Sequence, residues 1–324
     1  MKTKKVVVLI NVLSANADKD ELDVLDQASF AEEALEQLGY ETERLFMDLN
    51  LSETAEQLHK INPLFVFNLV ESLEKDAQLI HLAPLLLEHL HIPFTGCRSE
   101  SMFITSNKTL TKKMMSAAGL PTPKQIDNIK TQKVERTKQY IAKPIWEDAS
   151  VGISDENILR GDVQIIQAFL DKQPDIPYFF EEYIGGREFN ISVLGGSKGP
   201  EVLPIPEILF ENFPEGKPKI IGYNAKWDES SFEYHHTNRA FGLEKKEPQL
   251  AKRLKQICLD SWNLFGLKGY ARVDLRVDDQ GNPWILEINA NPCLSEDAGF
   301  YAAVQEAGYT FPQVIKRIIE DAWN

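Results

Sequence analysis

The first hundred residues alternate short apolar runs with amphipathic stretches, and this alternation limits the possible folds more than any other feature of the chain. Residues 6–12 (VVVLINV) and 64–70 (LFVFNLV) predict buried strands. Residues 23–39 and 77–91 have the apolar spacing of helices. Strands that alternate with helices run parallel beneath the helices that cover them. We therefore predict an N-terminal α/β domain over residues 1–100, with ligands near the carboxyl ends of its strands.

The rest of the chain changes to an α+β pattern. A central block, residues 101–185, opens with a helix that stops at Gly119. Its strands, predicted at 140–145 and 178–184, flank a loop of small residues. The C-terminal block, residues 186–324, carries a long helix, two further strands and a final helix. We predict an α/β chain, α+β in parts, with three domains.

Composition limits the classes of partner. The net charge of −14 and the pI near 5.0 argue against binding to nucleic acid or to anionic membranes. No apolar run approaches the length of a membrane span, and we interpret the apolar N-terminus as a strand and not as an export signal. Cys97, Cys258 and Cys293 lie far apart without CxxC spacing, which fits a reducing compartment. We expect a cytoplasmic protein.

A polar face runs through a predicted hairpin near the C-terminus. Residues 270–277 (YARVDLRV) and 283–289 (PWILEIN) predict two strands, and Gly281 supplies the turn. Alternate residues of a strand share a face. One face collects the polar residues Arg272, Asp274, Arg276, Glu287 and Asn289. The opposite face collects the apolar residues Val273, Leu275, Val277, Trp284, Leu286 and Ile288.

The simplest register of this hairpin builds a metal site. A turn centred just before Gly281 sets Asp274 across from Glu287, and Arg272 across from Asn289. Oxygen ligands without His or Cys suit Mg²⁺, and an arginine beside them suits a phosphoryl group. The alternative is the solvated face of an edge hairpin. We favour the site, because Asp and Asn are poor strand formers and opposed carboxylates repel unless a cation separates them.

Two lysines are candidate phosphate ligands. Lys143 ends a strand just before the small-residue loop 147–154 (EDASVGIS), whose backbone N–H groups could contact phosphate oxygens. Lys108 lies at a helix start, where anions are favoured. Each has an ordinary alternative: a Lys-Pro turn for Lys143, and a surface position beside Lys112 and Lys113 for Lys108.

Two glutamates flank a predicted hinge. Glu181 ends an apolar strand before a Gly-Gly turn, and Glu188 follows that turn. Carboxylates there could accept hydrogen bonds from an amino group or from ribose hydroxyls, although ordinary exposed glutamates are as plausible for either residue alone. No Walker A or GxGxxG pattern occurs, so any nucleotide must be held in another way.

Taken together and in order, these motifs resemble the ATP-grasp superfamily, and its D-alanine–D-alanine ligase-like branch most closely. The resemblance rests on KxxxxK at a helix start, KP before a small-residue loop, EEYIGGREF, and RVDL followed by LEINANP. It covers nearly the whole chain, including FNLVES and IPFTGCRSESM in the looser N-terminal match. It implies a three-domain fold in which an N-terminal parallel-sheet domain precedes two α+β subdomains that enclose ATP.

The resemblance also implies a reaction and its residues. A carboxylate would be phosphorylated by ATP to an acyl phosphate, which an amine then attacks. Two Mg²⁺ ions, or Mn²⁺, would bind Asp274, Glu287 and Asn289. Catalytic roles would fall to Arg272, Lys226 and Ser150. ATP contacts would come from Lys108, Lys143, Ala149, Ser150, Val151, Gly152, Glu181, Glu182, Tyr183, Ile184, Glu188 and Lys226.

Within that set, the resemblance assigns parts of ATP to particular residues. Lys108 and Lys143 would contact the phosphates, and residues 149–152 would form a lid over them. Glu181 would meet the adenine and Glu188 the ribose. Lys226 would lie on the γ-phosphate side, and Arg272 would stabilise the phosphoryl group during its transfer.

Four departures fall on the amino-acid side of the implied site. Glu21 is a poor counterpart of the family's substrate-binding Glu, and Trp227 stands where a Tyr is usual. Cys293 replaces a Gly, where we favour a small packing residue over a catalytic thiol, and Ala298 replaces a Ser. We therefore predict a ligase that joins small amino acids other than D-alanine alone. D-alanine–D-alanine ligation proper and a nucleotide-binding pseudoenzyme stay as alternatives, and a homodimer is the default assembly.

Overall fold

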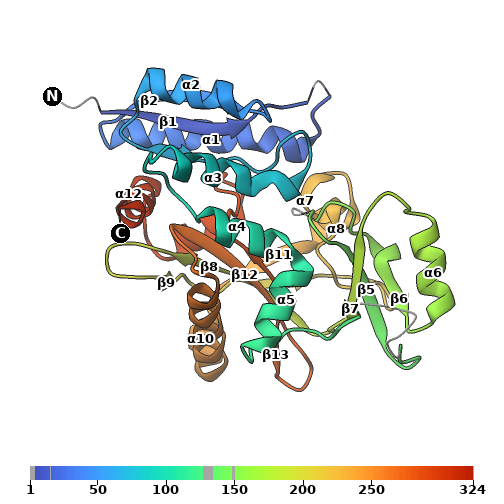
Figure 1. Ribbon diagram of the computed structural model, residues 1–324. Coiled ribbons are helices and arrows are strands. Elements are labelled where there is room, and N and C mark those ends of the chain that lie inside the picture. The colour runs from blue at the N-terminus through green and yellow to red at the C-terminus, as the bar shows by residue number, and fades with distance from the viewer. Residues whose placement is uncertain (1–3, 15, 127–133, 148–149, 324) are drawn as a thin grey trace.

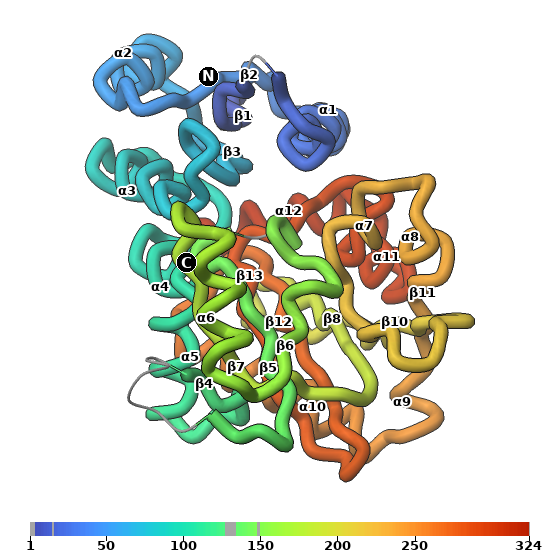
Figure 2. The backbone as a smooth tube through the Cα atoms, turned by 90° about the vertical axis from the view of Figure 1, so that its right-hand side faces the viewer, coloured from blue at the N-terminus to red at the C-terminus, as the bar shows by residue number. Residues whose placement is uncertain are grey.

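The computed structural model describes residues 4–14, 16–126, 134–147 and 150–323, so Ala149 of the predicted lid lies outside the described residues. Three β-sheets organise the described part of the chain (Figure 1). A three-stranded sheet comes first in the sequence, a four-stranded sheet is central, and a six-stranded sheet belongs to the C-terminal part. Figure 2 shows the first sheet and its helices stacked on one side of the other two sheets.

The N-terminal sheet is parallel, with strand order β2-β1-β3, as predicted. Even-numbered residues of β1, such as Val8, pack against α1, whereas odd-numbered residues, such as Leu9, pack towards α2 and α3. Both faces are thus buried, which explains the unbroken apolar run of this strand. The elements are β1 (Lys5–Asn11), α1 (Lys19–Gln37), β2 (Glu41–Met47), α2 (Leu51–Ile61), β3 (Val66–Asn68), the 3₁₀ helix η1 (Ala77–His81) and α3 (Leu82–His89).

Helix α1 begins four residues before the predicted start. Asp18 is its N-cap, and the Glu21 carboxylate accepts from the Asp18 backbone N–H at 3.3 Å. This capping box satisfies backbone donors that would otherwise lack partners, so the helix extends into the acidic segment. The extension places Asp20 and Glu21 in the first turn, at the carboxyl end of β1.

Two consecutive helices, α4 (Ser99–Ser106) and α5 (Lys108–Ala117), connect the first sheet to the second. Asn107 separates them, and its side chain accepts from the Leu110 backbone N–H at 3.0 Å, so Asn107 is the N-cap of α5. Gly119 adopts φ +78° and ends α5 as predicted. The sequence did not indicate α4, because its apolar residues show no clear helical spacing.

The central sheet is antiparallel, with strand order β4-β7-β5-β6. Helix α6 packs its apolar side on this sheet through Ile166, which is fully buried. The strands predicted at 140–145 and 178–184 are confirmed as β5 and β7. The elements are β4 (Gln125–Ile126), β5 (Gln139–Pro144), the 3₁₀ helix η2 (Asp155–Asn157), β6 (Ile158–Arg160), α6 (Val163–Asp171) and β7 (Tyr178–Glu182).

The C-terminal sheet has strand order β11-β10-β8-β12-β13, and β9 pairs with β8. Strands β9 and β10 lie within residues 199–224, a segment rich in Pro and Gly whose pattern predicts no strand. The elements are β8 (Arg187–Leu194), β9 (Glu201–Val202), β10 (Glu207–Phe210), α7 (Tyr223–Trp227), α8 (Phe232–His236), β11 (Thr237–Ala240), α9 (Leu243–Lys246), α10 (Pro248–Phe265), β12 (Tyr270–Val277), β13 (Pro283–Asn289), α11 (Gly299–Glu306) and α12 (Phe311–Ala322).

The β12–β13 hairpin has the predicted register. Asp274 pairs with Glu287, and Arg272 pairs with Asn289. The regular alternation predicted for the second strand is wrong at Trp284, which pairs with Arg276 of the polar face, and at Leu286. A bulge shifts the register so that Ile285 pairs with Leu275, and Leu286 then lines a cavity instead of the core.

One hydrophobic core joins the two ends of the chain. Val8 of β1 and Ala28 of α1 belong to the same buried cluster as Ile315 of α12 and Phe300 of α11. The N-terminal sheet is therefore packed onto the C-terminal part through apolar contacts, in addition to the covalent connection of the chain. Among the described residues, no helix is long and apolar enough to cross a membrane. The domain boundaries at residues 100 and 185 stay predictions.

Candidate active site

A cavity of about 770 Å³ lies where the three sheets meet. The hairpin β12–β13 supplies one wall, β5 and β7 supply another, and the start of α1 closes the N-terminal side. The predicted site residues that line it are Lys108, Lys143, Ser150, Val151, Glu181, Glu182, Tyr183, Ile184, Glu188, Lys226, Arg272, Asp274, Glu287 and Asn289.

Gly152, predicted in the lid, does not line the cavity. It adopts φ +71°, and a Cβ there would lie 3.0 Å from Cγ of Pro144. Its carbonyl oxygen accepts from Nδ2 of Asn157 at 2.9 Å. Gly152 therefore holds the base of the loop against β5, while Ser150 and Val151 face the cavity.

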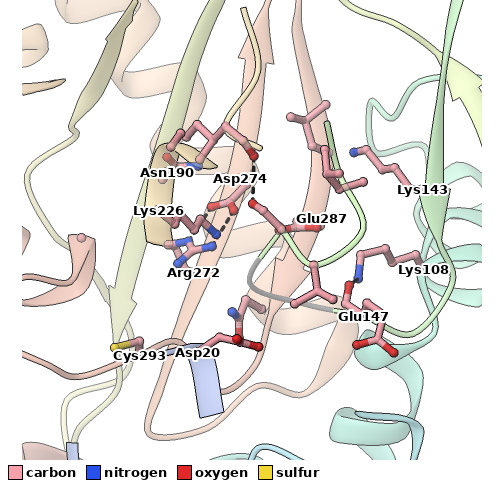
Figure 3. Close-up of a pocket in the computed structure, with 18 of the residues that line it drawn as sticks. Asp20, Lys108, Lys143, Glu147, Asn190, Lys226, Arg272, Asp274, Glu287 and Cys293 are labelled. Carbon is pink, nitrogen blue, oxygen red and sulfur yellow. Dashed lines mark hydrogen bonds and ion pairs between the residues drawn. The ribbon is translucent and has the colours of Figure 1, made fainter. Parts of the chain in front are cut away.

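Glu287 is the centre of charge in this cavity. Burial would raise the pKa of its carboxyl, but the positive charges of Lys108, Lys143, Arg272 and Lys226 outweigh that effect and lower the pKa to about 2. Figure 3 shows Lys108 and Lys143 on one side of Glu287 and Lys226 and Arg272 on the other. These four cations come from α5, β5, α7 and β12, so the fold brings together segments that are distant in sequence.

Arg272 and Asp274 form a two-point ion pair beside Glu287. Nε of Arg272 donates to Oδ1 of Asp274 at 2.7 Å, and Nη2 donates to Oδ2 at 2.8 Å. Asn190 lies opposite Asp274 on β8 and also lines the cavity. Sequence reasoning missed Asn190, although it follows Glu188 by two residues on one strand and so shares its face.

The oxygen atoms of Asp274, Glu287 and Asn289 fit a hard divalent cation such as Mg²⁺. Glu287 is ionised under ordinary conditions, and carboxylate and amide oxygens are the ligands this ion prefers. Oδ1 of Asn289 accepts from the Asn291 backbone N–H at 2.9 Å, which orients the amide. In the described part of the chain, no group of three or more His, Cys, Asp or Glu residues forms a complete metal cage. A cation held by Asp274, Glu287 and Asn289 would complete its coordination with water or with oxygens of a bound phosphate.

Glu181 is completely buried and faces two lysines. Its Oε2 lies 2.5 Å from Nζ of Lys112, and its Oε1 lies 2.8 Å from Nζ of Lys143. Burial lowers the pKa of Lys112, and the Glu181 charge opposes that effect. Within the described residues neither oxygen accepts a hydrogen bond of good geometry, so the attraction is chiefly one of charge. The surface position considered for Lys108 is wrong: Lys108 is buried at 6% exposure, and its neighbour Lys112 is buried at 3% exposure.

Glu188 also faces a buried cation. Its Oε2 accepts from Nη2 of Arg276 at 2.7 Å and from Nε at 3.1 Å, and Arg276 is only 2% exposed. Arg276 donates further to the carbonyl oxygen of Ile184 at 2.7 Å. This network ties β12 to the hinge between β7 and β8, an interaction that the sequence did not indicate.

Glu147 and Ser150 each make a contact with another segment of the chain. Nζ of Lys108 donates to the carbonyl oxygen of Glu147 at 2.5 Å. Ser150 adopts φ +65°, and its hydroxyl donates to the carbonyl oxygen of Ile221 at 2.8 Å. Glu147 is thus linked to α5, and Ser150 is linked to the segment that leads into α7.

The N-terminal side of the cavity is acidic. Glu21 lines it, accepts from the Ser14 hydroxyl at 3.0 Å and forms an ion pair with Lys75 at 2.8 Å. A tyrosine hydroxyl is present here even though Trp227 carries none: Tyr223 donates to Oδ1 of Asp20 at 3.2 Å. This bond connects α7 to the start of α1.

Cys293 is a poor nucleophile in this setting. Burial and the nearby Asp23 carboxylate raise the pKa of its thiol well above the ordinary value. The sulfur lies 3.0 Å from Oδ2 of Asp23 and 3.3 Å from the Ser295 hydroxyl oxygen. A protonated, hydrogen-bonded thiol fits a packing residue better than a catalytic one.

Comparisons with known proteins agree with this geometry. The family model described as D-ala D-ala ligase C-terminus matches residues 113–320. An uncharacterized protein of Sinorhizobium fredii, y4sG, is 32% identical over 89% of this chain and 85% of its own length. A D-alanine–D-alanine ligase of Acinetobacter baumannii is 31% identical over 72% of this chain and 73% of its own length.

The fold is also shared with solved structures. A crystal structure of D-alanine–D-alanine ligase from Bacillus anthracis complexed with ATP matches 98% of this chain and 97% of its own, with a TM-score of 0.74 at 20% identity. The three-domain ATP-grasp fold predicted from the sequence is thereby confirmed. The family match spans most of the chain, and both relatives named above exceed 30% identity. The chain therefore belongs to the D-alanine–D-alanine ligase family of ATP-grasp ligases.

Proposed function

We propose that this protein is an ATP-dependent carboxylate–amine ligase that joins two small amino acids. One carboxylate oxygen attacks the γ-phosphorus of ATP, the bond to the β-phosphate oxygen breaks, and ADP leaves. The amine of the second amino acid then attacks the acyl phosphate carbon, phosphate leaves, and the amine gives up a proton. Atoms and charge balance as two amino acids and ATP converted to an amide, ADP and phosphate.

The observation that carries this proposal is the set of four cations around Glu287. Lys108, Lys143, Lys226 and Arg272 converge on one cavity from four elements of the chain. Phosphoryl transfer requires mainly positioning and neutralisation of charge, which such an arrangement supplies. A binding module would not need an arginine placed beside two carboxylates and an amide.

The assigned roles follow from these positions. Lys108 and Lys143 contact phosphate oxygens, and Lys226 and Arg272 stabilise the group in transfer. Divalent cations, when bound at Asp274, Glu287 and Asn289, neutralise phosphate charge. Ser150 orders the lid, with Ala149, Val151 and Gly152 as its other members.

The nucleoside contacts belong to the same proposal. Glu181 acts on ATP by holding Lys143 in place, and its predicted contact with adenine stays a prediction. Tyr183 and Ile184 surround the base together with Glu182. Glu188 accepts from the ribose while Arg276 fixes its orientation.

The residues on the amino-acid side of the cavity determine which substrates the protein joins. Trp227, Cys293 and Ala298 all line the cavity, and none supplies a hydroxyl. We infer substrates other than D-alanine alone. D-alanine–D-alanine ligation proper is the second candidate, because a relative of that name is 31% identical over 72% of this chain.

The test is release of ADP and phosphate from Mg·ATP with D- and L-amino acids, singly and in pairs, with mass spectrometry of the products. Glu287→Gln serves as the blank. Release that requires one particular pair and yields its condensed product supports the ligase and names its substrates. Tight Mg·ATP binding with no stimulated release from any pair overturns ligation of small amino acids and favours a binding module. Absence of Mg·ATP binding overturns the whole proposal.

A further inference from the structure

Arg239 is a cation on the cavity wall that no motif of the sequence singled out. It belongs to β11, at the edge of the C-terminal sheet, and it lines the cavity. Its Nη1 donates to the backbone carbonyl of Asp297 at 3.0 Å. A Cβ placed on Gly299 would lie 3.6 Å from its Nε, so the side chain lies against the first residue of α11.

The surroundings of Arg239 favour an anion. Arg239 keeps an exposed side chain. Partial desolvation and the charge of Arg272 lower the pKa of its guanidinium, and the charge of Asp297 opposes them. In the described part of the chain no carboxylate side chain forms an ion pair with Arg239, whose hydrogen bond goes to a neutral carbonyl. Arg272 already has the Asp274 carboxylate as its partner, so a further anion in the cavity is attracted chiefly to the Arg239 guanidinium.

The N-terminus of α11 adds to the same local charge. The helix begins at Gly299, and its N-cap, Ala298, makes no side-chain hydrogen bond to the first turn. Both residues line the cavity. Backbone N–H groups at such a helix start bind negative groups, and here they lie next to the Arg239 guanidinium.

The position of Arg239 relative to Glu287 identifies which anion it meets. Lys108, Lys143, Arg272 and Lys226 are the charges that lower the pKa of Glu287 most. Arg239 instead neighbours Arg272, Asp297 and Cys293. Figure 3 shows Cys293 well away from Lys108 and Lys143. Arg239 therefore lies beyond Arg272, on the side of the cavity opposite the phosphate-binding lysines.

We propose that Arg239 binds the carboxylate of the acceptor amino acid and presents its amine to the acyl group held beside Arg272. This inference rests on the proposed ligase function. It names the acceptor class as amino acids with a free carboxylate, in contrast to simple amines and amino-acid amides.

The test compares Arg239→Gln, Arg239→Lys and the wild type in steady-state ADP release. The acceptors are D- and L-alanine and D- and L-serine, each beside its carboxamide. Arg253→Gln is the matched control, since Arg253 also donates to a backbone carbonyl, that of Gly281, but lies outside the cavity lining. The KM values for ATP and for the donor amino acid are measured in parallel.

We expect the wild type to prefer the free acid over its carboxamide. In Arg239→Gln the KM for the acid rises roughly 10- to 100-fold, as expected for loss of a charged hydrogen bond. The KM for the carboxamide and for ATP stays unchanged, so the preference for the acid disappears. Arg239→Lys recovers part of it, and Arg253→Gln behaves as the wild type.

Several results would overturn the inference. If the KM for acid and carboxamide rise together, Arg239 only supports the loop at Asp297. If kcat falls with no change in acceptor KM, Arg239 acts on the group in transfer. If the wild type condenses amino acids while all variants keep its acid preference, the inference fails and the proposed function stands. If the wild type condenses no pair, both fail together.

Discussion

Nζ of Lys112 and Oε2 of Glu181 lie 2.5 Å apart, and the two side chains are only 2% and 0% exposed. The second oxygen of Glu181 faces Lys143 at 2.8 Å. One buried carboxylate thus compensates two ammonium groups. Glu181 thereby holds Lys143 at the cavity wall, so the proposed phosphate-binding side depends on a residue that need not touch the nucleotide.

Glu181→Gln should destabilise the fold strongly, because it leaves two buried ammonium groups facing a neutral amide. Breaking a buried ion pair from one side costs about 3–5 kcal/mol. The adjacent Glu182 gives a matched control: its ion pair with Lys138 at 2.7 Å is partly exposed, and Glu182→Gln should cost about 0–1 kcal/mol. Urea denaturation of the three proteins measures the difference. Equal free energies of unfolding for both variants would show that Glu181 does not hold these lysines.

Glu287→Gln should abolish turnover and weaken Mg·ATP binding while the protein stays folded. The change removes the negative charge at the point where four cations and the proposed metal ions meet. We expect kcat to fall by roughly 100-fold or more and the Kd for Mg·ATP to rise by about tenfold or more. Calorimetric titration with Mg·ATP and thermal unfolding check binding and fold. The control is Glu296→Gln, an exposed glutamate outside the cavity lining. Full activity of Glu287→Gln would remove the hairpin from the mechanism.

The hairpin register could be predicted because it depends on local chemistry. The turn at Gly281 and the two-residue period of strands together place Asp274 opposite Glu287, and the structure has that pairing. The bulge at Leu286 could not be predicted, because it depends on how β13 packs against α4 and α5. Local patterns set pairing, whereas neighbouring elements set where that pairing is interrupted.

The partners of buried charges could not be predicted either. In sequence, Lys112 resembles any helical lysine. It is buried because α5 packs beside β7 and β13, where Glu181 of β7 forms an ion pair with it. Arg239 lies in a stretch without a recognisable motif, and it reaches the cavity because β11 pairs with β10 at the sheet edge. In both cases the decisive contact is between residues far apart in the chain, which single-sequence patterns do not encode.

Tyr223→Phe should raise the KM for amino acids and leave the KM for ATP unchanged. The Tyr223 hydroxyl donates to Asp20 at 3.2 Å and so links α7 to α1 on the side of the cavity away from Lys143. Loss of one such bond costs about 1 kcal/mol, so a rise of roughly fivefold is expected. Tyr40→Phe is the control, since the Tyr40 ring packs on Phe65 outside the cavity lining. An equal rise in the KM for ATP would argue against a role confined to the amino-acid side.

The stability of the fold should fall steeply above pH 9. Burial raises the pKa of the Cys97 thiol from 9.0 to about 12, and its sulfur contacts the backbone of Lys268. The unfolded chain loses this proton near pH 9 while the folded chain retains it, so stability is complete below pH 9 and is lost between pH 9 and 12. Each such group contributes about 1.4 kcal/mol per pH unit.

Cys97→Ser isolates this contribution, because serine has nearly the same shape and does not titrate in that range. We expect the free energy of unfolding of Cys97→Ser to decline less steeply between pH 9 and 12 than that of the wild type, by about the slope of one group. Urea denaturation at closely spaced pH values measures both slopes. Cys258, Cys293 and Tyr270, whose pKa values are also raised by burial, contribute to the residual decline in the variant. Identical slopes would mean that the Cys97 thiol ionises equally in both states, and that its burial does not control its protonation.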